Sequence, residues 1–103
     1  QLLNDAIEEA VAHAHVNETD EILAFATSAL REASNGTQII SDINKKHEID
    51  LQVLNGDEEA AMTFLAVRRW LGWSAGKLLV IDIGGGSLEI ASGIDEKSYV
   101  LEC

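Results

Sequence analysis

Residues 77–89 read KLLVIDIGGGSLE, and this stretch determines what the rest of the chain can form. The mostly apolar run 77–83 predicts the most strongly buried strand of the chain. The consecutive residues Gly84, Gly85 and Gly86 then end the run, and residues 87–90 resume an extended pattern. Glycine adopts positive φ without steric cost and allows close approach to the backbone, so we expect a turn with accessible amide groups.

The turn is flanked by acids, which suggests what it binds. Successive backbone N–H groups can form a concave site for an anion, and phosphate is the usual occupant. Asp82 and Glu89 bracket the loop and would repel a phosphate unless a hard cation such as Mg²⁺ lies between them. The loop therefore predicts phosphate and metal together. A glycine-rich hairpin with two solvated acids remains the alternative.

The remaining chain predicts alternating helices and strands. The expected helices cover residues 2–15, then from Thr27 or Ser28 to a stop at Asn35 and Gly36, 37–46, and from Asp57 to Leu71; the expected strands cover 22–26, buried on both faces, 49–54 and 98–101. This order predicts an α/β layer with one mixed sheet flanked by helices.

The acidic triplet Asp57, Glu58 and Glu59 opens the last of these helices. Acids in a first helical turn are stabilised by the helix dipole, and Asn55 with Glu58 matches a capping box. The functional interpretation is that one carboxylate faces the glycine loop and orients or deprotonates a water for attack on phosphorus. Spacing alone does not choose which carboxylate does so.

Composition excludes several classes of function. The chain has 103 residues and a net charge of −11, which argues against nucleic acid as a partner. No apolar run is long enough for a membrane span, and the single Cys103 permits no internal disulfide, so we expect a cytoplasmic protein. The pair Arg68 and Arg69 is expected on a solvated helix face. Since the chain opens without Met, we expect an interior segment of a longer protein.

Three segments together resemble the exopolyphosphatase / guanosine pentaphosphate phosphohydrolase (Ppx/GppA) family: ATSALREASN at 26–35, VLNGDEEA at 53–60 and VIDIGGGSLE at 80–89. The resemblance implies a ribonuclease-H-like fold of the actin-like ATPase superfamily. It also implies Mg²⁺-dependent hydrolysis of the terminal phosphoanhydride of inorganic polyphosphate or of guanosine pentaphosphate. The family's first phosphate-binding loop and the C-terminal half of its fold are absent from residues 1–103, so we expect a partial domain, inactive in isolation, that forms homo-oligomers such as a dimer.

The resemblance also implies roles for individual residues. Glu59 matches the general base for the attacking water, and Asp82 and Glu89 match the acids around the metal. Gly84, Gly85, Gly86 and Ser87 match the family's second phosphate-binding loop, and Arg31 matches an arginine that contacts phosphate in the active-site cleft. Asn35 matches as well, with a role that the resemblance leaves open.

Two other functions use the same glycine loop. An actin-like or chaperone-type ATPase would grip ATP with it, and a non-catalytic alarmone or nucleotide sensor would bind without releasing phosphate. Glu59 and Arg31 favour the phosphatase over the ATPase, whereas tight ligand binding without phosphate release would support the sensor.

Overall fold

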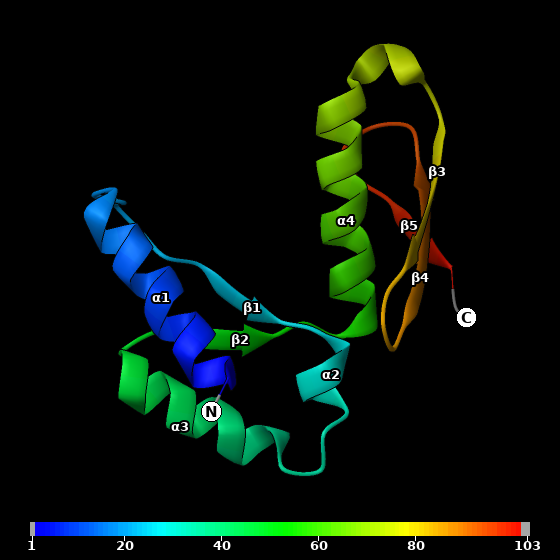
Figure 1. Ribbon diagram of the computed structural model, residues 1–103. Coiled ribbons are helices and arrows are strands. Elements are labelled where there is room, and N and C mark those ends of the chain that lie inside the picture. Colours follow the sequence, from blue (N-terminus) through cyan, green and yellow to red (C-terminus); the bar gives the residue numbers. More distant parts are fainter. Residues whose placement is uncertain (1, 102–103) are drawn as a thin grey trace.

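The computed structural model describes residues 2–101, so the prediction that Cys103 forms no internal disulfide lies outside the described residues. Two lobes meet at the start of α4 (Figure 1). The first lobe contains α1 (Leu2–Val16), β1 (Ala24–Ala26), α2 (Ser28–Arg31), α3 (Gly36–His47) and β2 (Leu51–Val53). The second contains α4 (Gly56–Leu71), the short 3₁₀ helix η1 (Trp73–Ala75), β3 (Leu78–Ile83), β4 (Leu88–Gly93) and β5 (Tyr99–Leu101). The predicted elements are present, with shifted ends.

The first lobe is a parallel crossover. Strands β1 and β2 pair in parallel with Ala24 opposite Leu51 and Ala26 opposite Val53, and α2 and α3 form the connection between them. The prediction that residues 22–26 are buried on both faces was wrong, because β1 has only three residues and Phe25 is 41% exposed. Each of the two strands has one neighbouring strand, and Ala26 is the one residue of β1 and β2 that is buried.

The predicted helix stop at Gly36 was also wrong. Helix α2 ends at Arg31, and Gly36 is the first residue of α3, where it is buried. A Cβ atom at Gly36 would collide with the backbone carbonyl of Leu30. The glycine is therefore needed for close packing of two chain segments and not for terminating a helix.

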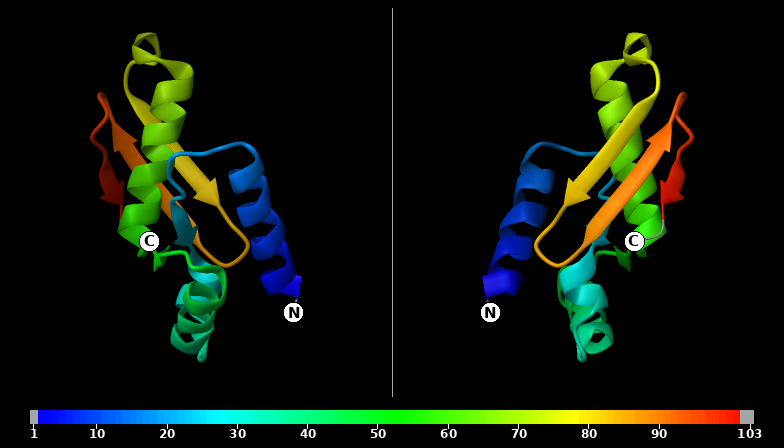
Figure 2. Two further views of the ribbon diagram at one scale, coloured as in Figure 1. Left: turned by 90° about the vertical axis from the view of Figure 1, so that its left-hand side faces the viewer. Right: turned by 90° about the vertical axis from the view of Figure 1, so that its right-hand side faces the viewer.

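The second lobe is an antiparallel sheet with a helix on one face. Strands β3, β4 and β5 form a meander, and α4 lies against it, as the views in Figures 1 and 2 agree. The core of this lobe consists of Ala60 and Phe64 from α4 and Ala91 from β4. The parallel and antiparallel pairings thus belong to two separate sheets, so the prediction of one mixed sheet was wrong.

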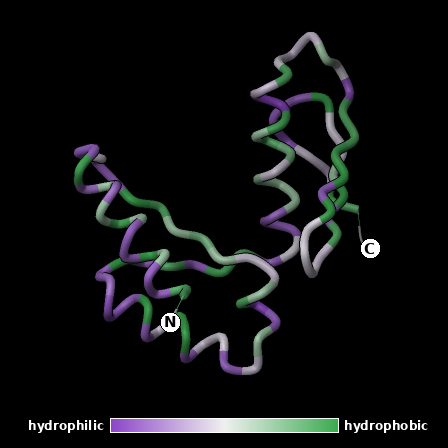
Figure 3. Tube along the Cα trace, viewed as in Figure 1, coloured by the Kyte–Doolittle hydropathy of each residue, from purple (hydrophilic) through white to green (hydrophobic). Residues whose placement is uncertain are grey.

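Only the inner face of the antiparallel sheet is covered. On β3 the exposed residues alternate with half-buried ones, and the outward Leu79, Ile81 and Ile83 are 61%, 55% and 79% exposed. The apolar character of this strand is visible in Figure 3. The prediction that residues 77–83 form the most strongly buried strand was therefore wrong, because α4 covers one face of β3 and no described element covers the other.

Arg68 ties the far end of this lobe together and contradicts the expected solvated face. It is 1% exposed, and its guanidinium donates to the carbonyl oxygens of Asp95 (3.2 Å), Gly72 (3.4 Å), Gly76 (2.5 Å) and Gly93 (3.1 Å). The charge also lies 5.7 Å from the Phe64 ring centroid. Arg69, one residue further on, is exposed and pairs with Glu96 at 3.3 Å, so the expectation holds for that residue alone.

Within residues 2–101, none of the helices has both the length and the apolar composition that crossing a membrane requires.

Replacing Arg68 by Met should destabilise the fold by roughly 3–5 kcal/mol, because the buried Gly93 carbonyl would lose this donor and three less buried carbonyls would lose theirs. Arg68→Lys should recover little, since an ammonium group cannot span several carbonyls as a planar guanidinium does. Urea denaturation measures the change. Arg69→Met is the matched control and should lower the free energy of unfolding by less than about 1 kcal/mol. Equal losses for the two variants would show that the buried hydrogen bonds of Arg68 do not stabilise the fold.

Candidate functional site

Helix α4 begins with a complete capping box. The Asn55 side chain accepts a hydrogen bond from the Glu58 N–H (2.8 Å), and the Glu58 carboxylate accepts from the Asn55 N–H (2.9 Å). The capping interpretation is thus confirmed for Glu58, whereas Asp57 is exposed. Of the acidic triplet, only Glu59 remains for the functional interpretation.

Three carboxylates converge next to this helix start. Asp82 and Glu89 are direct partners in the β3–β4 register and point to the same face, the one that packs against α4. Glu59 approaches from the first turn of α4. One oxygen from each of the three carboxylates lies within 4.8 Å of the other two. The structure therefore brings together the residues that the sequence indicated as base and metal ligands.

Glu89 is the unusual member of this carboxylate cluster. It is 6% exposed, and its Oε2 atom is buried without a hydrogen-bond partner. The alternative of two solvated acids therefore fails for Glu89. A buried, unpaired carboxylate oxygen beside two further acids is costly unless a cation neutralises it. Hard oxygen donors of this kind are the ligands that Mg²⁺ takes, so the cluster fits such an ion.

Arg31 holds one acid of the cluster. Its Nη1 atom donates to the Leu54 carbonyl at 2.7 Å and to Glu59 Oε2 at 3.3 Å. The side chains of this ion pair are 24% and 15% exposed, so bulk water screens it only partly. Arg31 thereby links the first lobe to the start of α4 and offsets part of the negative charge of the cluster.

The glycine loop lies at the tip of the β3–β4 hairpin. It is closed by a hydrogen bond from the Gly84 N–H to the Ser87 carbonyl at 3.0 Å, and Gly84, Gly85 and Gly86 are exposed. The expected positive φ was wrong, because among the described glycines only Gly72 and Gly76 adopt it. A Cβ at Gly85 would meet open space, so no close contact in the structure requires glycine at that position.

Two site residues were missed by the sequence analysis. The Thr63 hydroxyl donates to Asp82 Oδ2 at 3.3 Å, and Ser28 is only 9% exposed beside Gly86. Thr63 could have been found, because it lies one helical turn after Glu59 and so shares its face. Asn35 is the N-cap residue of α3 and makes no capping hydrogen bond with its side chain.

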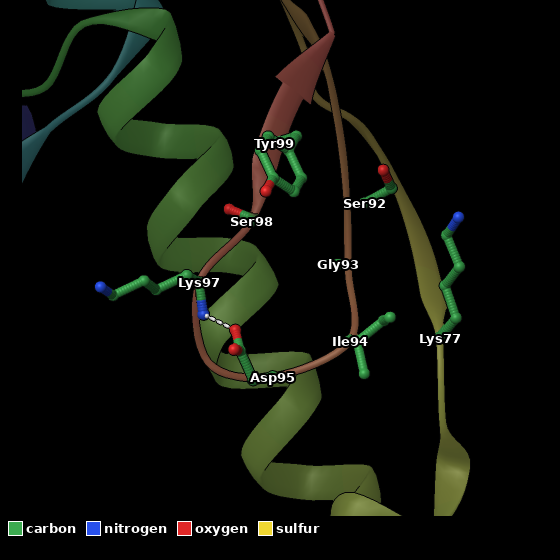
Figure 4. A pocket seen from close by; sticks show the side chains of 8 residues that line it. All are labelled: Lys77, Ser92, Gly93, Ile94, Asp95, Lys97, Ser98 and Tyr99. Carbon is green, nitrogen blue, oxygen red and sulfur yellow. Dashed lines mark hydrogen bonds between the residues drawn. The ribbon is translucent and has the colours of Figure 1, made fainter.

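A hollow of about 430 Å³ lies at the C-terminal end of β4, away from the carboxylate cluster, and Lys77 and Lys97 are among the residues that line it (Figure 4). In this view the two lysine side chains point away from each other. The cations therefore do not converge on one ligand, and this hollow is not the candidate site.

The chain is similar in sequence to one known protein family and to several of its members. The profile of the Ppx/GppA phosphatase family matches residues 3–102. Exopolyphosphatase 1 of Mycobacterium tuberculosis (strain H37Rv) is 54% identical over 80 residues, which is 78% of this chain and 23% of that protein. Exopolyphosphatase 1 of Mycobacterium leprae is 55% identical over 80 residues, 78% of this chain and 24% of that protein. An uncharacterised protein of Streptomyces coelicolor is 48% identical over 71 residues, 69% of this chain and 21% of that protein. The chain thus spans less than a quarter of the length of these relatives.

The Arg31–Glu59 ion pair should show a coupling energy of about 1–3 kcal/mol in a double-mutant cycle of Arg31→Met and Glu59→Gln. Arg31→Met alone leaves Glu59 beside two acids without its cation, whereas the double variant removes both charges and so recovers part of the loss. Denaturant unfolding of the four proteins measures the coupling. Strictly additive losses would show that the pair is only a surface contact.

Proposed function

Because the chain belongs to the Ppx/GppA phosphatase family, we propose that it forms part of an enzyme that hydrolyses the terminal phosphoanhydride of inorganic polyphosphate. Support comes from relatives that are named exopolyphosphatases and are more than half identical where they align. Guanosine pentaphosphate has the same reactive end group and is the second substrate that the family resemblance implies. The chain covers less than a quarter of those relatives, so the activity is proposed for the full-length protein.

The observation that carries the proposal is the buried, unpartnered Oε2 atom of Glu89 within the carboxylate cluster. Asp82 and Glu89 would hold Mg²⁺, and Thr63 fixes Asp82 by a hydrogen bond. When bound, the ion would neutralise charge on the phosphate oxygens. A bound cation would explain why acidic side chains lie beside a loop that binds an anion, because it would offset their repulsion of the phosphate.

Glu59 is proposed to position the nucleophile. Its carboxylate accepts a hydrogen bond from Arg31 and can accept a proton from a water molecule placed beside the terminal phosphate. The water oxygen then forms a bond to phosphorus while the bond from phosphorus to the bridging oxygen breaks. The products are orthophosphate and a chain that is shorter by one phosphate. Charge on the transferred group is spread over its outer oxygens, so positioning and electrostatics do most of the work.

The glycine loop and Arg31 would bind those outer oxygens. The amide groups of Gly85 and Gly86 lie at the exposed tip of the hairpin, where oriented N–H groups stabilise an oxyanion without reorganisation. Ser87 closes the same turn. Since the chain has a net charge of −11, the basic groups that attract a long polyphosphate would come from other parts of the full-length protein.

The proposed fold of the full-length protein is the ribonuclease-H-like, actin-like one. The glycine turn after Asp82 and the antiparallel β3–β4–β5 meander support this proposal.

Replacing Glu59 by Gln in the full-length protein should lower the rate of phosphate release from polyphosphate by about 100-fold or more, because the amide cannot accept the proton. Phosphate release at saturating polyphosphate measures this. Glu58→Gln, in the adjacent capping box, is the matched control and should retain turnover. Normal turnover in Glu59→Gln would remove Glu59 from its role, and phosphate release from ATP but not from polyphosphate would favour an actin-like ATPase.

Mg²⁺ should raise the midpoint of thermal unfolding, with a stabilisation of about 1–3 kcal/mol near saturation, because the ion binds only the folded carboxylate cluster. Glu89→Gln should remove most of this gain and should itself be tolerated without metal, since it relieves repulsion. Glu8→Gln on exposed α1 should keep the full response. The metal assignment is overturned if the wild-type protein unfolds at the same temperature in Mg²⁺ and in chelator.

A further inference from the structure

Thr63 is a polar residue at an unusual place in α4. It lies in the interior of the helix, one turn after Glu59 and directly before the fully buried Phe64. Threonine is β-branched and loses side-chain freedom in a helix, so it is a weaker helix former than alanine or leucine. Helix propensity therefore does not explain Thr63, and its tertiary contacts have to be considered.

The hydroxyl of Thr63 bonds across to the antiparallel sheet. A threonine within a helix commonly donates to a backbone carbonyl one turn earlier. The Thr63 hydroxyl instead donates to Asp82 Oδ2 on β3 at 3.3 Å. Both side chains are half-buried, so water competes with this hydrogen bond only in part. The bond connects α4 to one of the two acids that are proposed to hold Mg²⁺.

The position of Asp82 explains why this restraint matters. Asp82 is paired directly with Glu89 in the β3–β4 register, and like charges that face each other across two strands repel. A half-buried aspartate without a hydrogen-bond donor could turn away from Glu89 toward solvent. The Thr63 hydroxyl donates to the carboxylate and so holds Asp82 on the face of the carboxylate cluster.

The orientation of a ligand matters more for Mg²⁺ than for Ca²⁺. Mg²⁺ demands a nearly ideal octahedral arrangement of its ligands, whereas Ca²⁺ accepts about six to eight oxygen atoms in flexible geometry. A carboxylate with a fixed orientation therefore favours Mg²⁺, and a carboxylate that turns freely weakens the binding of Mg²⁺ more than that of Ca²⁺. Groups that orient a metal ligand typically contribute about ten- to hundred-fold in affinity.

We propose that Thr63 is a positioning residue that makes the carboxylate cluster selective for Mg²⁺ over Ca²⁺ by holding Asp82 in a fixed orientation. This rests on the proposed function, because it takes the cluster as the metal site of the phosphatase. It goes further by assigning the choice of ion to a residue that is not itself a ligand. Thr63 acts on the ion only through the Asp82 carboxylate.

Calorimetric titration of the full-length protein with Mg²⁺ and with Ca²⁺, in the absence of substrate, tests the assignment. Thr63→Val keeps the shape of the side chain but lacks the hydroxyl. We expect its Kd for Mg²⁺ to rise about ten-fold or more, while its Kd for Ca²⁺ rises less than about three-fold. Thr63→Ser keeps a hydroxyl and should restore most of the wild-type preference. The heat that Glu89→Gln abolishes identifies binding at the carboxylate cluster.

Two further variants complete the test. Thr37→Val, at an exposed threonine of α3, is the matched control and should leave both dissociation constants unchanged. Thr63→Ala is a second loss variant, because alanine lacks the hydroxyl and is the strongest helix former. It should shift the ratio of the two constants in the same direction as Thr63→Val. Thermal unfolding without metal verifies that each variant retains its fold.

The outcomes separate this inference from the proposed function. If both loss variants keep the wild-type ratio of the two constants, the role of Thr63 is wrong and the phosphatase stands. If Thr63→Ser loses the preference as Thr63→Val does, the hydroxyl is not its cause and the proposal is also overturned. If the wild-type protein binds neither ion at the cluster, the metal assignment and this inference fail together, and phosphate release from polyphosphate then decides the proposed activity separately.

Discussion

The contact between α4 and the inner face of the β3–β4 hairpin places every acid of the candidate site. Phe64 is fully buried against Ala91, and Gly93 lacks a side chain where a Cβ would lie 3.0 Å from the Phe64 ring. This packing fixes which face of the hairpin meets the helix. Because side chains alternate along a strand, Asp82 and Glu89 then point toward α4, and Glu59 lies in the first turn of that helix.

Arginines secure α4 at both ends, and both do so through backbone carbonyls. Arg31 bonds to the Leu54 carbonyl at the N-terminal end, and Arg68 bonds to carbonyls of the connecting loops at the C-terminal end. The two differ in their charge partners. Arg31 also pairs with Glu59, whereas Arg68 meets only carbonyls and aromatic rings among its described contacts. Arg31 therefore interacts with the charges of the candidate site, whereas Arg68 has a structural role.

The sequence predicted the elements well, because strong local signals mark them. The triple glycine after an apolar run gave the hairpin, and the Asn55–Glu58 spacing gave the start of α4. The sequence predicted burial poorly, because an apolar composition shows that a strand can be buried but not whether another element covers it. Strand β3 is largely apolar on both faces, yet only one of them is covered. Arg68 was misjudged for a related reason: three of the carbonyls that it contacts, those of Gly76, Gly93 and Asp95, lie eight or more residues further along the chain, where no local pattern reveals them. Likewise, convergence of the acids follows from strand register and helix packing, which depend on the folded chain.

The uncovered outer face of the antiparallel sheet has a consequence for colloidal behaviour. The chain has a net charge of −11, and this sheet face presents an exposed apolar surface formed by Leu79, Ile81 and Ile83. Mutual repulsion between equally charged copies keeps such surfaces apart over about one Debye length, roughly 10 Å at 0.1 M salt and 3 Å at 1 M. Concentrated salt shortens this protective range while it strengthens apolar association. Copies of this chain should accordingly stay monodisperse at low salt concentration and self-associate at high salt concentration.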